Sequence, residues 1–133
     1  MTENEVSQHI LALERGALDR WCKGDPDGFL EISAPDVVYF DPFLPQRIDG
    51  LPALQKYYAQ LRGKVLADGY ELVAPEVQVH DEIALLTFRF VSHGKDLEMR
   101  WNTTEVYRHC AQGWRIIHSH WSLTQPFQAS PQA

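Results

Sequence analysis

The chain has 133 residues, with 12 Lys or Arg against 18 Asp or Glu and a formal net charge of -6 at pH 7. This length suits one domain, and a hydrophobic share of 44% is typical of a globular protein rather than a disordered one. No apolar run approaches the ~18 residues of a membrane span, and an acidic chain is a poor partner for nucleic acids or anionic membranes. Two cysteines, Cys22 and Cys110, are too few for a disulfide framework, so we expect free thiols and a cytoplasmic location.

Helical periodicity marks the first half of the chain. Apolar residues recur at three- and four-residue steps over 5–23, which predicts a first amphipathic helix. The Gly-Asp-Pro sequence at 24–26 ends it and starts a second short helix, with Asp25 as the N-cap. A third helix is expected over roughly 51–62, with Asp49 as its cap.

Pro35-Asp36 is expected to break the chain, and a short strand is predicted directly after it at 37–40. In the second half of the chain the apolar residues recur with a period of two, which is typical of strands. The links between its strand-like segments are short and polar, which predicts an antiparallel meander and an α+β architecture with helices on one face. We expect a single domain over 1–125 and a loose tail over 126–133. The four strand-like segments are 70–80, 83–93, 97–110 and 114–124.

Several strings resemble known families. GDPDGFLEISAPDVVYFDPFLPQRIDG (24–50) is similar to bacterial ketosteroid isomerases, which have an Asp-Pro-Phe-type turn after the first strand. YYAQL (57–61) and TEVYRHCAQGWRIIHSHWS (104–122) resemble the association (hub) domain of calcium/calmodulin-dependent protein kinase II and its polyketide-cyclase-like (SnoaL-like) bacterial relatives. Both belong to the nuclear transport factor 2-like superfamily. The resemblance implies a cone-shaped fold, three N-terminal helices on a curved sheet, and a pocket that serves many unrelated activities.

Asp41 is the most informative single position. It ends a predicted strand, precedes a proline and lies amid Tyr39, Phe40 and Phe43. A carboxylate among aromatic groups suits a general base, and the resemblance assigns this role to the aspartate of the Asp-Pro-Phe turn. The structural alternative is an aspartate that accepts backbone hydrogen bonds within the turn.

The donors that an isomerase needs for the enolate oxygen are poorly matched. By resemblance, the first-helix tyrosine falls on Ala17, which has no donor, and the protonated pocket aspartate falls on Thr103. The supporting tyrosine of the third helix corresponds to Tyr58. A true steroid isomerase is therefore disfavoured, and Tyr58 and Thr103 are expected to orient or polarise a substrate beside Asp41.

The hub-type resemblance adds pocket positions. Its arginines, which bind small carboxylates, correspond to Arg89, Glu105 and Trp121. Only Arg89 keeps the cation, so either an Arg89–Glu105 ion pair or carboxylate binding by Arg89 is expected. Strand alternation adds inward-facing residues. The expected ligand-binding residues are Trp21, Tyr39, Tyr57, Arg89, Trp101, Glu105, Ile117, Ser119 and Trp121.

No cofactor is expected, because the chain has neither a Gly-rich phosphate loop nor a cysteine cluster. His118 and His120 form a His-x-His pair that has the spacing to bind a metal. Strand parity, however, places both opposite Trp121 and away from the pocket, where a structural role is favoured. Cys22 lacks the surroundings of a nucleophile.

The sequence thus predicts a pocket for a small apolar molecule with a carbonyl or carboxylate end. If the protein is an enzyme, the favoured chemistry is proton abstraction next to a carbonyl, as in isomerases, dehydratases or cyclases, with Asp41 as base. The alternative is a non-catalytic association or ligand-sensing domain. Because helices are expected on one sheet face only, a homodimer through the outer face is predicted.

Overall fold

A computed structural model describes residues 1–95 and 97–125, so the tail expected at 126–133 lies outside the described residues. The helices are α1 (Glu3–Trp21), α2 (Asp27–Glu31) and α3 (Leu51–Leu61). The strands are β1 (Ser33–Phe40), β2 (Ile48–Asp49), β3 (Gly69–His80), β4 (Ile83–His93), β5 (Glu98–Cys110) and β6 (Gly113–Leu123). Among the described residues, no helix is long and apolar enough to cross a membrane.

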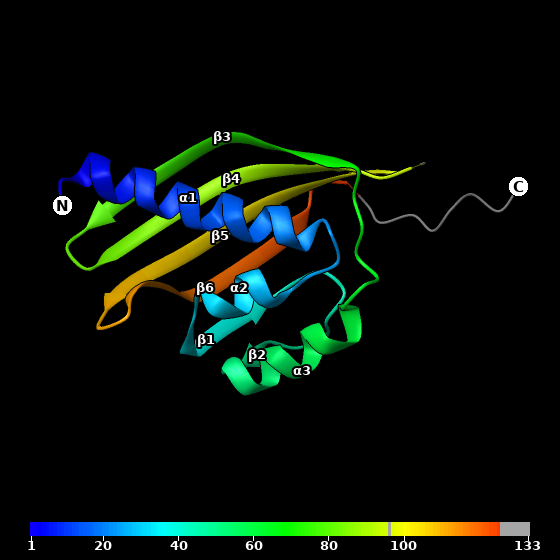
Figure 1. Cartoon of the computed structure of the whole chain (residues 1–133), viewed down its shortest axis with the longest axis horizontal. Helices are drawn as coiled ribbons and strands as arrows, with labels where there is room; N and C mark the ends of the chain where they lie inside the picture. The colour runs from blue at the N-terminus through cyan, green and yellow to red at the C-terminus, as the bar shows by residue number, and fades with distance from the viewer. Residues whose placement is uncertain (96, 126–133) are drawn as a thin grey trace, which may run out of the picture.

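The strands form one sheet in the order β2-β1-β6-β5-β4-β3. Strands β3 to β6 pair as an antiparallel meander, and β1 joins β6 in parallel. The helices lie on the same face of the sheet, with α1 across β3, β4 and β5 and the other two near β1 and β6 (Figure 1). The predicted α+β class, with three helices before a mainly antiparallel sheet, is confirmed.

Register shifts bend three of the strands. In β3 the shift lies between Val73 and Glu76, where Ala74 adopts a positive φ of 51°. A second shift lies between Val106 and Tyr107, where β5 pairs with β6. Such irregularities increase strand twist and curve the sheet around the helices.

The expected chain break at Pro35-Asp36 is wrong. Strand β1 begins at Ser33 and continues through Pro35 and Asp36. A register shift against β6 between Ser33 and Val38 accommodates the proline, which has no N–H to donate to the ladder.

The helix starts show two kinds of capping. Thr2 and Glu5 make a capping box at α1. The predicted Asp49 cap of α3 is wrong, because Asp49 lies in β2 and its carboxylate accepts a bond from Arg47 at 2.6 Å. The N-cap is instead Gly50, whose φ of 89° favours glycine. Asp25 does accept the first amide of α2, from Asp27 at 3.0 Å.

The turn after α1 is docked onto the segment that follows α3. The Gly63 N–H donates to the Gly24 carbonyl at 2.8 Å, and the Ala67 N–H donates to the Cys22 carbonyl at 2.9 Å. Gly24 has a φ of +84°, and a Cβ built there would lie 3.0 Å from the Gly63 Cα. Only glycine therefore fits both the turn and the close approach of the two backbones.

We expect Gly24→Ala to destabilise the protein by about 2 kcal/mol or more, because it forces a left-handed conformation and a backbone clash. The matched control is Gly16→Ala on the exposed face of α1, where an added Cβ meets nothing within 4 Å. That change should stabilise the helix by about 0.5–1 kcal/mol. Urea denaturation of both variants measures the two effects, and equal unfolding midpoints would contradict the role of Gly24.

Candidate functional site

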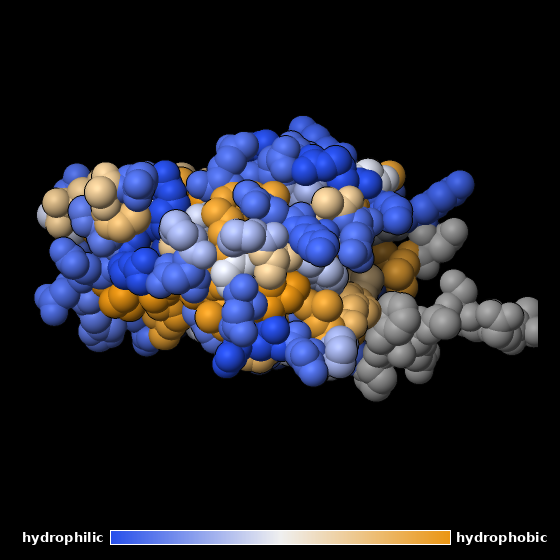
Figure 2. Space-filling model, turned by 90° about the horizontal axis from the view of Figure 1, so that it is seen from below, coloured by the Kyte–Doolittle hydropathy of each residue, from blue (hydrophilic) through white to orange (hydrophobic). Residues whose placement is uncertain are grey.

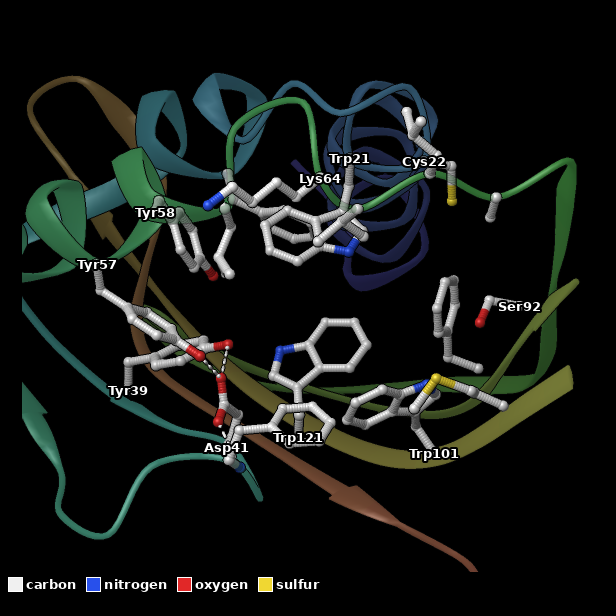
Figure 3. A pocket seen from close by; sticks show the side chains of 18 residues that line it. Trp21, Cys22, Tyr39, Asp41, Tyr57, Tyr58, Lys64, Ser92, Trp101 and Trp121 are labelled. Atoms are coloured by element: carbon white, nitrogen blue, oxygen red, sulfur yellow. Dashed lines mark hydrogen bonds between the residues drawn. The ribbon is translucent and has the colours of Figure 1, made fainter. Parts of the chain in front are cut away.

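A cavity of about 430 Å³ lies between the sheet and the helices, which is within the size range of small-molecule sites. Half of its lining residues are aromatic, from all three helices and from the facing strands (Figure 3). The lining consists of Trp21, Cys22, Phe29, Tyr39, Asp41, Phe43, Tyr57, Tyr58, Leu61, Lys64, Val65, Leu66, Ala67, Phe90, Ser92, Met99, Trp101 and Trp121. Such a wall favours a largely apolar ligand.

Aromatic side chains brace this cavity against one another. The Trp21 ring packs on Tyr58 at 5.1 Å and edge-on to Phe29 at 5.8 Å. From the sheet side, Trp121 packs edge-on to Trp101 at 6.1 Å. In Figure 3, Trp21 and Trp121 face each other from opposite sides of the open space. Their flat surfaces suit a planar or ring-containing ligand.

Asp41 is fixed at the end of β1 by three donors. Its Oδ2 accepts hydrogen bonds from the Tyr57 hydroxyl at 2.6 Å and the Tyr39 hydroxyl at 2.9 Å (Figure 3). Its Oδ1 accepts the Phe43 N–H at 2.8 Å. Asp41 is therefore both a turn residue, as the structural alternative held, and a carboxylate on the cavity wall.

The neighbouring phenols stay protonated. Burial, together with nearby charged and phenolic groups, raises the pKa of Tyr39 and of Tyr58 well above the usual value. Burial and the hydrogen bond to the Asp41 carboxylate raise the pKa of Tyr57 as well. Tyr58 packs edge-on to Tyr39, with ring centroids 5.6 Å apart, and the phenols that bond Asp41 are those of Tyr39 and Tyr57. On α3 it is thus Tyr57, the neighbour of the expected Tyr58, that bonds Asp41 directly.

Five of the expected site residues do not line the cavity: Thr103, Arg89, Glu105, Ile117 and Ser119. Thr103 is buried on β5 between its register partners Phe88 and Trp121, and its hydroxyl has no hydrogen-bond partner among the described residues. The lining does include Trp21, Tyr39, Tyr57, Trp101 and Trp121, together with Asp41 and Tyr58.

The expected Arg89–Glu105 ion pair is wrong, because the two side chains lie on opposite faces of the sheet. Arg89 pairs with Asn102 and is exposed, whereas Glu105 pairs with Leu86 and is fully buried. Successive side chains along a strand point to opposite faces of the sheet. Asn102, the partner of Arg89, lies three residues before Glu105, so Arg89 and Glu105 point to opposite faces.

Ile117 departs from its predicted position for a related reason. The register shift pairs Tyr107 with Ile116 and Val106 with His118, which leaves Ile117 without a direct partner on β5. Ile116 is consequently 1% exposed in the core, while Ile117 is half-buried. A bulge of this kind breaks the simple alternation on which the prediction depended.

Behind Trp121 lies a buried acid pair that the sequence analysis did not find. Trp121 Nε1 donates to Ser119 Oγ at 3.0 Å, and Ser119 Oγ donates to Glu105 Oε2 at 2.8 Å. On the other side, the Tyr107 hydroxyl donates to Glu14 Oε1 at 2.7 Å. A chain of hydrogen bonds thus leads from the cavity wall into the core.

Glu14 and Glu105 lie close together, and both are fully buried. Glu14 Oε2 and Glu105 Oε1 have no hydrogen-bond partner among the described residues. Burial raises the pKa of both groups, and the charge of Glu14 raises that of Glu105 further. The signal in the sequence was an acidic residue on the apolar stripe of α1, at Glu14 between Ile10 and Leu18.

We expect Glu105→Gln to flatten the pH dependence of stability. The folded-state pKa of Glu105 lies above its ordinary value of 4.5, so above that pH the folded chain binds more protons than the unfolded one. Stability is then lost as the pH rises. Gln donates to Glu14 and accepts from Ser119 without needing a proton.

Thermal melts at pH 5 and pH 8 measure this effect. Wild type should lose about 4 °C or more relative to Glu105→Gln across that interval, on the scale of ~1.4 kcal/mol per pKa unit. Glu76→Gln, at an exposed position on β3, is the matched control and should follow wild type. If the melting temperatures of wild type and Glu105→Gln change equally with pH, the raised pKa of Glu105 is contradicted.

His118 and His120 lie on the outer face, where their register partners are Val106 and Thr104. Both rings pack near Phe40, that of His120 stacked at 5.0 Å. Burial and the neighbouring His120 lower the pKa of His118. No group of three metal-ligating side chains forms within residues 1–95 and 97–125.

A family model described as "SnoaL-like domain" matches residues 11–126. The chain therefore belongs to the SnoaL-like family. Among curated proteins, none matches the chain.

Solved structures place the fold among nuclear transport factor 2-like proteins. A candidate ketosteroid isomerase from Parabacteroides distasonis ATCC 8503 is 42% identical, with a TM-score of 0.80 over 88% of this chain and 86% of that one. A candidate dehydratase of the NTF2-like family from Streptomyces avermitilis is 18% identical, with a TM-score of 0.76 over 94% and 100%. The CaMKII hub of S. rosetta is 22% identical, with a TM-score of 0.72 over 88% and 95%. The last two show likeness of fold alone.

Proposed function

We propose that this SnoaL-like protein binds a small, largely apolar carbonyl compound and removes a proton next to its carbonyl group, with Asp41 as the base. The observation that carries the proposal is the Asp41 carboxylate, held by Tyr39 and Tyr57 on the wall of an aromatic cavity. The 42% identical relative is named as a candidate ketosteroid isomerase, which supports the same class of reaction.

In this reaction the Asp41 carboxylate takes the proton from the carbon beside the carbonyl, and the C–H electron pair moves to form an enolate. Asp41, now a neutral acid, returns the proton at the same or another carbon, which exchanges or isomerises the substrate. The two phenols orient the carboxylate, and the apolar wall keeps water away from the enolate.

The substrate is not expected to be a steroid. Ala17 has no donor group, and Thr103 is absent from the described lining of the cavity. Neither residue therefore supplies the oxyanion hydrogen bond that the resemblance to steroid isomerases would need. Isomerisation, dehydration and aldol-type cyclisation all begin with the same proton transfer.

We expect Asp41→Asn to lower proton abstraction by ~10²-fold or more while folding is retained. The measurement is deuterium incorporation from D₂O into cyclic ketones such as 2-tetralone, followed by proton NMR. Asp49→Asn, which alters an exposed carboxylate paired with Arg47, is the matched control and should keep the wild-type rate.

Thermal melts show whether the Asp41 variant remains folded. Asn still accepts the Phe43 N–H but its NH2 group cannot accept from the two phenols, so stability should fall by about 1–3 kcal/mol. Equal exchange rates for wild type and a folded Asp41→Asn protein would end the assignment of Asp41 as base.

The alternative function is an association module, for which the similarity in fold to the kinase hub domain argues. Either function is compatible with our second proposal, a homodimer through the outer face of the sheet. The helices cover the opposite face (Figure 1). Half-buried apolar side chains on β4 and β5, among them Leu85, Val91 and Val106, stand on the uncovered side.

Sedimentation velocity at micromolar concentration should show a dimer. Val106 lies mid-face between its register partners Leu85 and His118, so Val106→Glu should place a charge in the interface and shift the protein to monomer. Ala12→Glu, on the exposed side of α1, is the control. A monomeric wild type would refute the dimer, and a ring would favour the association module.

A further inference from the structure

The cavity contains one positive charge. Among the described residues that line it, Lys64 is the only Lys or Arg, and Asp41 is the only carboxylate. Figure 3 shows the Lys64 side chain reaching toward the end of the cavity where Tyr57, Tyr58 and Asp41 lie. A cation is thus available to a ligand whose body occupies the aromatic space.

The backbone around Lys64 is held in place. The Lys64 N–H donates to the Leu61 carbonyl at 2.9 Å, which continues the end of α3. On either side, Gly63 and Ala67 donate to carbonyls of the turn that follows α1, at 2.8 and 2.9 Å. Lys64 therefore has a defined position at the cavity mouth rather than a place on a free loop.

Lys64 has no acidic partner among the residues that the structure describes. Nearby, Arg62 binds Asp27 at 2.6 Å and Arg20 binds Asp25 at 2.9 Å. Lys64, in contrast, makes no ion pair with any residue of the described part of the chain, although the net charge is -6. Asp41 already accepts three hydrogen bonds. The exposed Lys64 ammonium is therefore the charged group of the lining that is open to a ligand arriving from solvent.

We propose that Lys64 determines ligand specificity, and that the ligand is an aromatic or otherwise largely apolar compound bearing a carboxylate. The carboxylate binds the Lys64 ammonium, and the apolar body packs between Trp21 and Trp121. This inference rests on the proposed function only in that the cavity is the ligand site. It does not require Asp41 to abstract a proton.

The test compares two probes of one shape, 2-naphthoate and the neutral 2-naphthamide, by isothermal titration calorimetry. Wild type should bind the acid more tightly than the amide. Lys64→Gln should weaken binding of the acid by about three- to ten-fold and change that of the amide by less than about two-fold. Lys64→Arg should keep the preference, as should Lys56→Gln, which alters an exposed lysine of α3 outside the lining.

Ionic strength supplies a second readout, because added salt should weaken binding of the acid but not of the amide. The inference is overturned if wild type shows no preference for the acid, if the preference survives in Lys64→Gln, or if neither probe binds. The proposed base is tested separately, by deuterium exchange into the ketone with wild type and with Asp41→Asn. The result of that experiment does not depend on how the two naphthalene probes bind.

Discussion

The paired hydrogen bonds from Tyr39 and Tyr57 to Asp41 fix how α3 stands against the sheet. Tyr39 belongs to β1, Asp41 follows the end of that strand, and Tyr57 belongs to α3. One carboxyl oxygen therefore joins two elements that backbone pairing does not connect. Because both donors are themselves part of the cavity wall, the same contact that positions the helix also shapes the site.

The carboxyl groups at the cavity and beneath it have two kinds of surroundings. Asp41 meets two phenols and an amide, all donors, and its charge is spread over them. Glu14 and Glu105 lie beside each other with one donor apiece, and burial raises the pKa of both. The first environment suits chemistry on a ligand. The second ties α1 to β5 beneath the cavity and supports Trp121 through Ser119.

Periodicity sufficed to predict the elements, because the helical and strand patterns are long and change once, near Tyr70. The position of Asp41 on the cavity lining could also be predicted, since an aspartate between an aromatic strand and a proline is a local signal. The choice between Tyr57 and Tyr58 was not available from sequence. Successive residues of a helix point about 100° apart, and only the docking of α3 decides which of them reaches Asp41.

The remaining errors arise from irregular backbone and long-range packing. The bulge that displaces Ile117 depends on the pairing of β5 with β6, and no residue type in either strand predicts where it lies. That Lys64 lines the cavity could not be predicted, because it lies in a connection whose path is set by contacts with Cys22 and Gly24, far away in the sequence. Glu14 was within reach of prediction, as a lone acid on an apolar stripe.

The parallel pairing of β1 with β6 has a consequence for how the protein folds. Val38 lies beside His118, 80 residues further along the chain, whereas the meander of β3 to β6 is joined by short links. Loop-closure entropy opposes the distant pairing more than the local ones, so the meander is expected to form first and β1 to join last. The cavity needs residues from both parts, and it therefore exists only once the fold is complete. A ligand that fills it stabilises the finished molecule over every intermediate that precedes it.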